Sequence, residues 1–171
     1  MFRNSILYIV IIISLVLTSY AVSTEKWSKI NFDGNNYMSM GLWKACTKTG
    51  NSTNCEKLPP KNNKSFNSTS LYIVRAMSIL NIIVLVFILL IMKTKHSGSV
   101  VLLLVLILIS FILSLGSVII WLAEFTKIKI ASGGTLDLKL SSSAYVQIVS
   151  YILTLAGLIY VYINKAKWNI T

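Results

Sequence analysis

The residues best suited to covalent chemistry lie in one short polar stretch, GLWKACTKTGNSTNC, residues 41–55. It holds both cysteines of the chain, Cys46 and Cys55. Asn-x-Ser/Thr glycosylation triplets lie in this stretch or soon after it, at Asn51, Asn63 and Asn67. Paired cysteines and glycosylated asparagines both belong to chain that is exposed in an oxidising, non-cytosolic compartment. The stretch therefore predicts an extracellular segment.

The spacing of the two cysteines suits a β-hairpin closed by a disulfide. Eight residues separate Cys46 from Cys55, and Thr49-Gly50-Asn51 among them can turn the chain. Residues 27–32 and 37–42 partly alternate between apolar and polar side chains, which is typical of short antiparallel strands. Two cysteines across such a hairpin should pair and stabilise the fold by roughly 2 to 3 kcal/mol. The alternative is two free thiols.

The sequence predicts no metal, catalytic or nucleic-acid site. A zinc site needs two ligands besides the cysteines, and the single histidine, His96, lies past the next apolar run. There are no paired carboxylates, no HExxH motif and no glycine-rich phosphate loop, so we expect neither an enzyme nor a cofactor. The net charge of +11 comes from residues that flank apolar runs or lie in polar loops. This placement indicates anionic lipid headgroups rather than nucleic acid as partners.

The composition decides which elements hold these residues. Hydrophobic residues make up 55% of the chain and charged residues 12%, and the mean hydropathy is +0.73. Four uncharged runs are each close to the roughly 20 residues that a membrane-spanning helix needs, at residues 4–24, 76–92, 97–123 and 140–164. In lipid such runs satisfy their backbone hydrogen bonds only as helices. We therefore predict a single membrane domain, residues 1–171.

Charge near the helix ends predicts the orientation. We expect helices at about 4–24, 71–92, 99–123 and 142–164. Between and after them lie extracellular loops 25–70 and 124–141, a cytosolic loop 93–98 and a short cytosolic tail 165–171. The last two segments are basic and contain no acid, which places them in the cytosol. The prediction is a multi-pass plasma-membrane protein with both termini cytosolic.

The first apolar segment has a second interpretation. Arg3, the apolar residues 6–17 and the small residues Ala21-Val22-Ser23 also fit a cleavable signal peptide. A retained helix is the favoured interpretation, and cleavage of residues 1–23 would leave three helices instead of four. In both cases the following loop is delivered to the extracellular side.

The loop after the first helix resembles the claudin family in a specific motif. Its members share a W…GLW…C…C signature, matched here at Trp27, Gly41, Leu42, Trp43, Cys46 and Cys55. Arg75, at the mouth of the second helix, also resembles the claudin pattern. The wider group contains peripheral myelin proteins, epithelial membrane proteins and calcium-channel gamma subunits. The resemblance depends on residues 27–76, although the four-helix topology extends it to the whole chain.

The resemblance implies a membrane α+β fold. Four transmembrane helices would form a left-handed bundle carrying a small extracellular antiparallel β-sheet, built mostly from the first loop with one strand from the second. The two tryptophans would anchor the sheet at the membrane surface, and the disulfide would pin two strands. The residue matching the claudin charge-selecting position is Glu56, and Lys57 follows it. From Glu25 to Arg75 the sequence contains eight bases and three acids, and the resulting positive field should attract anions.

Two features of the sequence depart from claudins. Its final residues, Trp168 to Thr171, do not match the hydrophobic C-terminal residue by which claudins dock junction scaffolds, so no scaffold-docking motif is expected. No cysteine lies near the cytosolic ends of the second or fourth helix, where claudins are palmitoylated.

Two classes of function follow from the resemblance. The first is cell-cell adhesion or a paracellular barrier with ion selectivity at cell-cell contacts. Its partners would be copies of this chain or claudin-family proteins in the same or the facing membrane. The alternative is an accessory subunit of another membrane protein, similar to the gamma subunits or epithelial membrane proteins, or a decoy that mimics a claudin.

Overall fold

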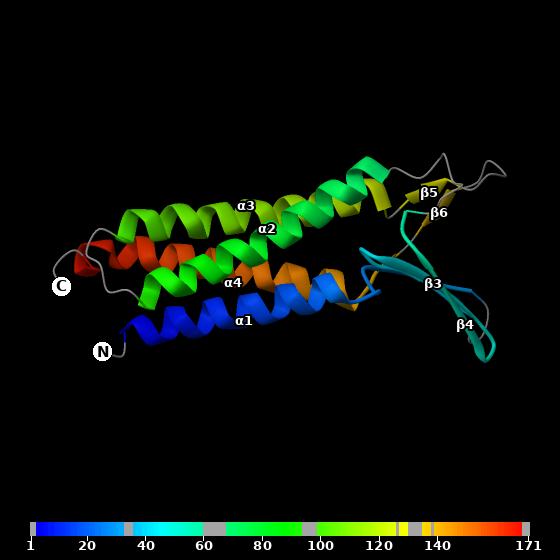
Figure 1. The fold of residues 1–171 in the computed structure, drawn as a ribbon, viewed down its shortest axis with the longest axis horizontal. Coiled ribbons are helices and arrows are strands. Elements are labelled where there is room, and N and C mark those ends of the chain that lie inside the picture. The colour runs from blue at the N-terminus through cyan, green and yellow to red at the C-terminus, as the bar shows by residue number, and fades with distance from the viewer. Residues whose placement is uncertain are drawn as a thin grey trace.

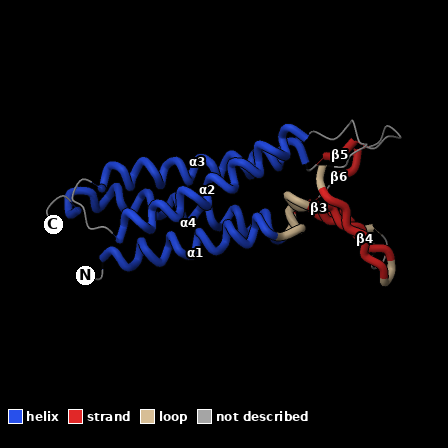
Figure 2. Tube along the Cα trace, in the orientation of Figure 1, coloured by secondary structure: helices blue, strands red, loops and turns tan. Residues whose placement is uncertain are grey.

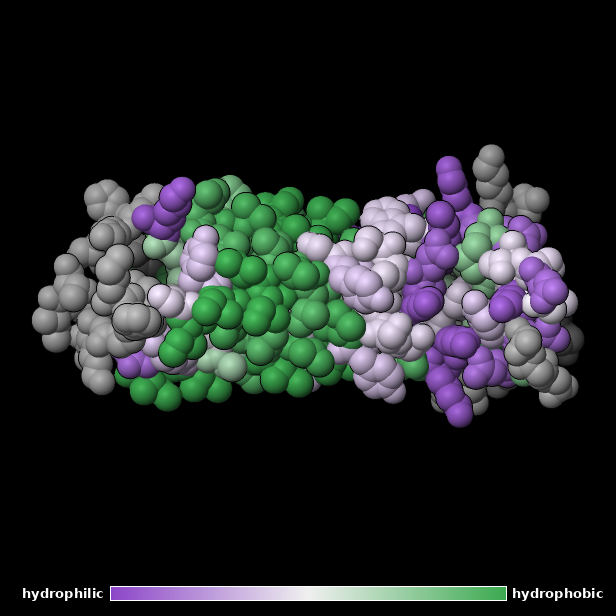
Figure 3. Space-filling model, turned by 90° about the horizontal axis from the view of Figure 1, so that it is seen from below, coloured by the Kyte–Doolittle hydropathy of each residue, from purple (hydrophilic) through white to green (hydrophobic). Residues whose placement is uncertain are grey.

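The protein forms an elongated bundle of four helices with a β-sheet at one end (Figures 1 and 2). The computed structural model describes residues 3–32, 36–59, 68–93, 99–125, 127–129, 135–137 and 139–168. The helices are α1 (Arg3–Ser23), α2 (Ser68–Lys93), α3 (Ser99–Phe125) and α4 (Ser142–Trp168). All four are long and apolar enough to cross a membrane, and a hydrophobic surface covers the middle of the bundle (Figure 3). The chain is a multi-pass membrane protein.

Polar residues at the sheet end of the bundle set where two helices begin. Helix α2 begins at Ser68, three residues before the expected position, and its first residues are Ser-Thr-Ser. Helix α4 follows Ser141, whose carbonyl accepts hydrogen bonds from the backbone N–H groups of Ala144 and Tyr145. Serine and threonine are favoured at helix N-termini because their hydroxyls can bond N–H groups that have no helical partner.

The bundle is packed in three levels. At the end away from the sheet, apolar residues of all four helices form one cluster: Leu7, Ile11, Leu85, Ile88, Val100, Leu103, Ile107 and Val161. A second apolar cluster lies beneath the sheet. Between them hydroxyl and amide side chains join neighbouring helices, with Ser110 Oγ donating to Asn81 Oδ1 at 2.6 Å and Gln147 Nε2 to Ser114 Oγ at 2.9 Å. Such bonds hold helices together where the hydrophobic effect between them is weak.

The sheet takes strands from both loops at its end of the bundle. Its strands are β1 (Ser28–Asn31), β2 (Tyr37–Met40), β3 (Lys44–Thr49), β4 (Ser52–Lys57) and β7 (Lys139–Leu140). They pair antiparallel in the order β4-β3-β2-β1-β7. A separate hairpin joins β5 (Lys127–Lys129) to β6 (Thr135–Asp137). The expected fold class, a four-helix bundle with an antiparallel sheet from both loops, is confirmed.

Candidate functional site

The candidate site is the sheet together with its attachment to the bundle, which we call the junction: Trp27, Leu42, Trp43, Arg75 and Trp121. Trp27 is fully buried, and its indole Nε1 donates a 2.6 Å hydrogen bond to the carbonyl of Ala21. Trp43 Nε1 donates to the carbonyl of Val22 at 2.8 Å. Both carbonyls belong to the last turn of α1, where backbone acceptors have no helical partner. The two tryptophans therefore complete the end of α1 and fix the sheet to it.

Gly41 and Leu42 make this close attachment possible. A Cβ atom on Gly41 would lie 2.5 Å from the Cα of Glu25 and 2.7 Å from the carbonyl oxygen of Thr24. Backbone atoms cannot move aside as a flexible side chain can, so any larger residue would push the sheet away from α1. Leu42 is fully buried in the apolar cluster beneath the sheet.

Trp121 is a junction residue that the sequence reasoning did not single out. Its ring centroid lies 5.0 Å from that of Trp27, and its Nε1 donates to Ser28 Oγ at 2.7 Å. Trp121 thus links α3 to β1. The sequence did hold one indication of this role: Trp121 lies near the end of an apolar run, where tryptophans are enriched at the membrane-water boundary.

Arg75 ties the second helix to the sheet. Its Nε donates to the carbonyl of Leu42 at 2.7 Å and its Nη2 to the carbonyl of Leu58 at 2.8 Å. The guanidinium carbon lies 4.7 Å from the ring centroid of Trp43 and 5.4 Å from that of Tyr72. A planar cation with donors on two sides suits this position, because it can bond two carbonyls while lying over aromatic rings.

The predicted disulfide is present. Cys46 and Cys55 lie directly opposite each other on β3 and β4, with their sulfurs joined at 2.10 Å. Glu25 lies beside them, so that three groups which can ligate metals lie within 4.8 Å of one another. The sulfurs carry neither a proton nor a thiolate charge while they are bonded to each other. The 2.8 Å approach of Glu25 Oε2 to Cys46 Sγ is therefore not a hydrogen bond, and the cluster is not a metal site.

Three of the other predicted positions, Asn51, Glu56 and Lys57, lie on the hairpin of β3 and β4. Asn51 is exposed in the turn between β3 and β4, next to Gly50, whose φ is +59°. Asn63 and Asn67 lie outside the residues that the structure describes. Glu56 and Lys57 are exposed neighbours on β4. Because successive strand residues point to opposite faces, their side chains lie on different sides of the sheet.

Most of the signature residues lie at or beside the junction, and the two signature cysteines lie on β3 and β4 of the sheet that it carries. Trp27 and Trp43 bond the end of α1, and Gly41 lies against the two residues that follow it. Arg75 bonds the carbonyl of Leu42, between β2 and β3, and that of Leu58, directly after β4. A comparison with curated protein sequences gave no match. The model of the PMP-22/EMP/MP20/Claudin family matches residues 3–168, nearly the whole chain. With four apolar helices, a disulfide-pinned sheet and a junction built from the signature residues, the chain belongs to the PMP-22/EMP/MP20/claudin family.

Proposed function

We propose that this protein mediates cell-cell adhesion or a paracellular barrier through its sheet, with the sheet outside the cell and both termini in the cytosol. The family is a non-enzymatic membrane family. The observation that carries the proposal is strand β4, which forms one edge of a sheet anchored to the bundle. All six of its residues are exposed.

An exposed edge strand is suited to pairing with another chain. Among the strands that the structure describes, β4 pairs only with β3. The backbone N–H and C=O groups on its outer side are therefore available to a strand of a second molecule. We propose that sheets of neighbouring copies, or of related family members, associate at this edge. The disulfide supports this role because it holds β4 against β3 and limits the conformational freedom of the edge.

The charges around the edge favour anions along such an assembly. Between Glu25 and Arg75 bases outnumber acids eight to three. Glu56 opposes this field, but its side chain and that of Lys57 lie on different faces of the sheet. Each face can therefore present a different charge to ions that pass beside it. We expect lower permeability for sodium than for chloride.

The test is a dilution potential across an epithelial monolayer that lacks its own claudins and expresses this chain. Glu56→Lys should strengthen the chloride preference and Lys57→Glu should weaken it. Lys93→Glu is the matched control, because Lys93 is exposed but lies at the other end of α2, outside the segment from Glu25 to Arg75. An unchanged resistance and ion preference, despite protein at the contacts, would contradict the barrier role.

Localisation separates barrier from accessory function in the same cells. An internally tagged chain should concentrate where two expressing cells meet and should leave contacts with non-expressing cells unlabelled. Uniform surface label, together with crosslinking to a different membrane protein, would contradict adhesion and support an accessory subunit instead.

A further inference from the structure

The register of the sheet puts all of its strand lysines on one face. Residues directly opposite on paired strands share a face, and so do residues two apart on one strand. The opposed pairs connect one face across all five strands: Lys29–Ser39, Ser39–Cys46, Cys46–Cys55 and Lys29–Lys139. The lysines of these strands all lie on this face. We call this set the lysine face: Lys29, Lys44, Lys48, Lys57 and Lys139.

The opposite face of the sheet has a different composition. It carries Ile30, Ala45 and Leu140, which pack against the apolar cluster beneath the sheet. It also carries Glu56, the acid of the five strands. The lysine face is therefore turned away from the bundle's apolar contacts, and the acid that lies against it is Glu25, from the segment before β1.

Two lysine pairs on this face are unfavourable for the sheet itself. Lys29 lies directly opposite Lys139, and Lys44 directly opposite Lys57. Like charges at such positions destabilise a sheet. Among the described residues one ion pair relieves them, between Lys44 Nζ and Glu25 Oε1 at 3.3 Å. Residues that are unfavourable for the fold tend to occur at functional sites, and an external anion would compensate the charge of these pairs.

The geometry holds some of these cations in place. Lys29 Nζ lies 4.2 Å and Lys48 Nζ 5.8 Å from the ring centroid of Tyr37 on the strand between them. These cation–π contacts reduce the freedom that binding would otherwise remove.

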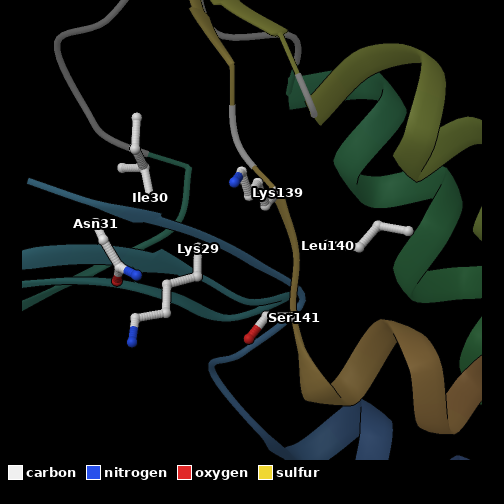
Figure 4. A pocket seen from close by; sticks show the side chains of 6 residues that line it. All are labelled: Lys29, Ile30, Asn31, Lys139, Leu140 and Ser141. Atoms are coloured by element: carbon white, nitrogen blue, oxygen red, sulfur yellow. The ribbon is translucent and has the colours of Figure 1, made fainter.

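At the other edge of the sheet, two lysines line a cavity of about 290 Å³. Its walls also include the Asn31 amide and the Ser141 hydroxyl. Lys29 and Asn31 project to the same side of β1, whereas Ile30 projects to the other (Figure 4). Because Lys29 Nζ lies over the Tyr37 ring of β2, whereas Lys139 lies on β7 on the other side of β1, the two ammonium groups can each bond a different sulfate or carboxylate group of one chain, beside the Asn31 amide and the Ser141 hydroxyl.

We propose that the lysine face binds a sulfated polysaccharide of the cell surface. The lysines come from four of the five strands, all except β2, and extend from β4 to β7, about 19 Å at roughly 4.8 Å per strand, so one linear chain could place several sulfates on them. A protein partner would need aromatic or aliphatic anchors. The one aromatic ring that the strands contribute to this face, Tyr37, is already occupied by two lysines. In cells the proposal depends on the extracellular orientation proposed above, but binding by the purified chain does not.

The test is binding of heparin to the full-length protein in nanodiscs, measured at several salt concentrations. The double variant Lys29→Gln/Lys139→Gln should bind at least about tenfold more weakly. Its slope of log Kd against log salt should be shallower by about two, because two cation–sulfate contacts are lost. The matched control is Lys26→Gln/Lys93→Gln, which removes two exposed charges outside the sheet and should leave binding unchanged.

Two further comparisons decide the interpretation. Lys29→Arg/Lys139→Arg should retain binding, which separates loss of charge from loss of fold. Desulfated heparin should bind far more weakly than heparin. Equal weakening in the control variant, equal binding of the desulfated polymer, or no weakening in the glutamine variant would each overturn the proposal. A failure of the barrier assay alone would leave this binding result intact.

Discussion

Replacing Arg75 by methionine should loosen the attachment of the sheet to the bundle. Arg75 is 8% exposed, so water replaces little of what its side chain provides. The substitution leaves the carbonyls of Leu42 and Leu58 without their donors, at about 1 to 3 kcal/mol each. It also removes contacts with the Trp43 and Tyr72 rings, at about 0.5 to 1 kcal/mol each. Because such terms are not fully additive, we expect a total of about 3 to 5 kcal/mol.

Hydrogen exchange of the sheet amides in nanodiscs measures this loss directly. A decrease of about 3 kcal/mol in the free energy of local opening speeds exchange by roughly a hundredfold. The effect should appear in peptides that cover β2 and β3, whereas peptides from the far end of the bundle should be unchanged. Arg75→Lys should fall between the two, because lysine keeps the charge but not the planar pair of donors.

The control is Lys93→Met, which removes an exposed cation from the other end of the same helix. Exchange in β2 and β3 that is no faster in Arg75→Met than in Lys93→Met would refute the role assigned to Arg75. Wild-type exchange in Arg75→Lys would refute the specific requirement for a guanidinium.

Four further predictions concern the first loop and the first helix. Gly41→Ala should destabilise the junction by about 1 to 3 kcal/mol, because the new methyl group meets the backbone of Glu25; an unchanged unfolding temperature would contradict this. Cys46→Ser should lower the free energy of unfolding by about 2 to 5 kcal/mol and reduce surface delivery; free alkylation of the wild-type thiols would contradict the disulfide. Asn51→Gln should abolish one glycosidase-sensitive gel shift, and an unchanged shift would contradict glycosylation at this position. The intact mass after deglycosylation should include residues 1–23, since Trp27 and Trp43 bond carbonyls of that helix; a product that begins near Thr24 would contradict a retained helix.

Much of this architecture is local and could be predicted from the sequence. Apolar runs of this length satisfy their backbone hydrogen bonds in lipid by forming helices. The number and approximate position of the helices therefore follow from the sequence. The Cys46–Cys55 disulfide also follows, because a short hairpin around Gly50 brings two nearby residues together. The claudin signature added the expectation that Trp27 and Trp43 anchor a sheet.

The tertiary structure decided which distant residues meet. No local pattern indicates that Trp121 of α3 lies against Trp27, that Lys139 pairs with Lys29, or that Arg75 bonds the carbonyls of Leu42 and Leu58. Each of these contacts depends on where the packed helices bring their ends. The lysine face depends on register as well, since a shift of one residue would move every side chain of a strand to the other face. The sequence alone therefore showed that lysines, tryptophans and an arginine lie in and around the loops. Which of them share a face of the sheet, and which contact one another, was decided by the way the helix bundle holds the strands.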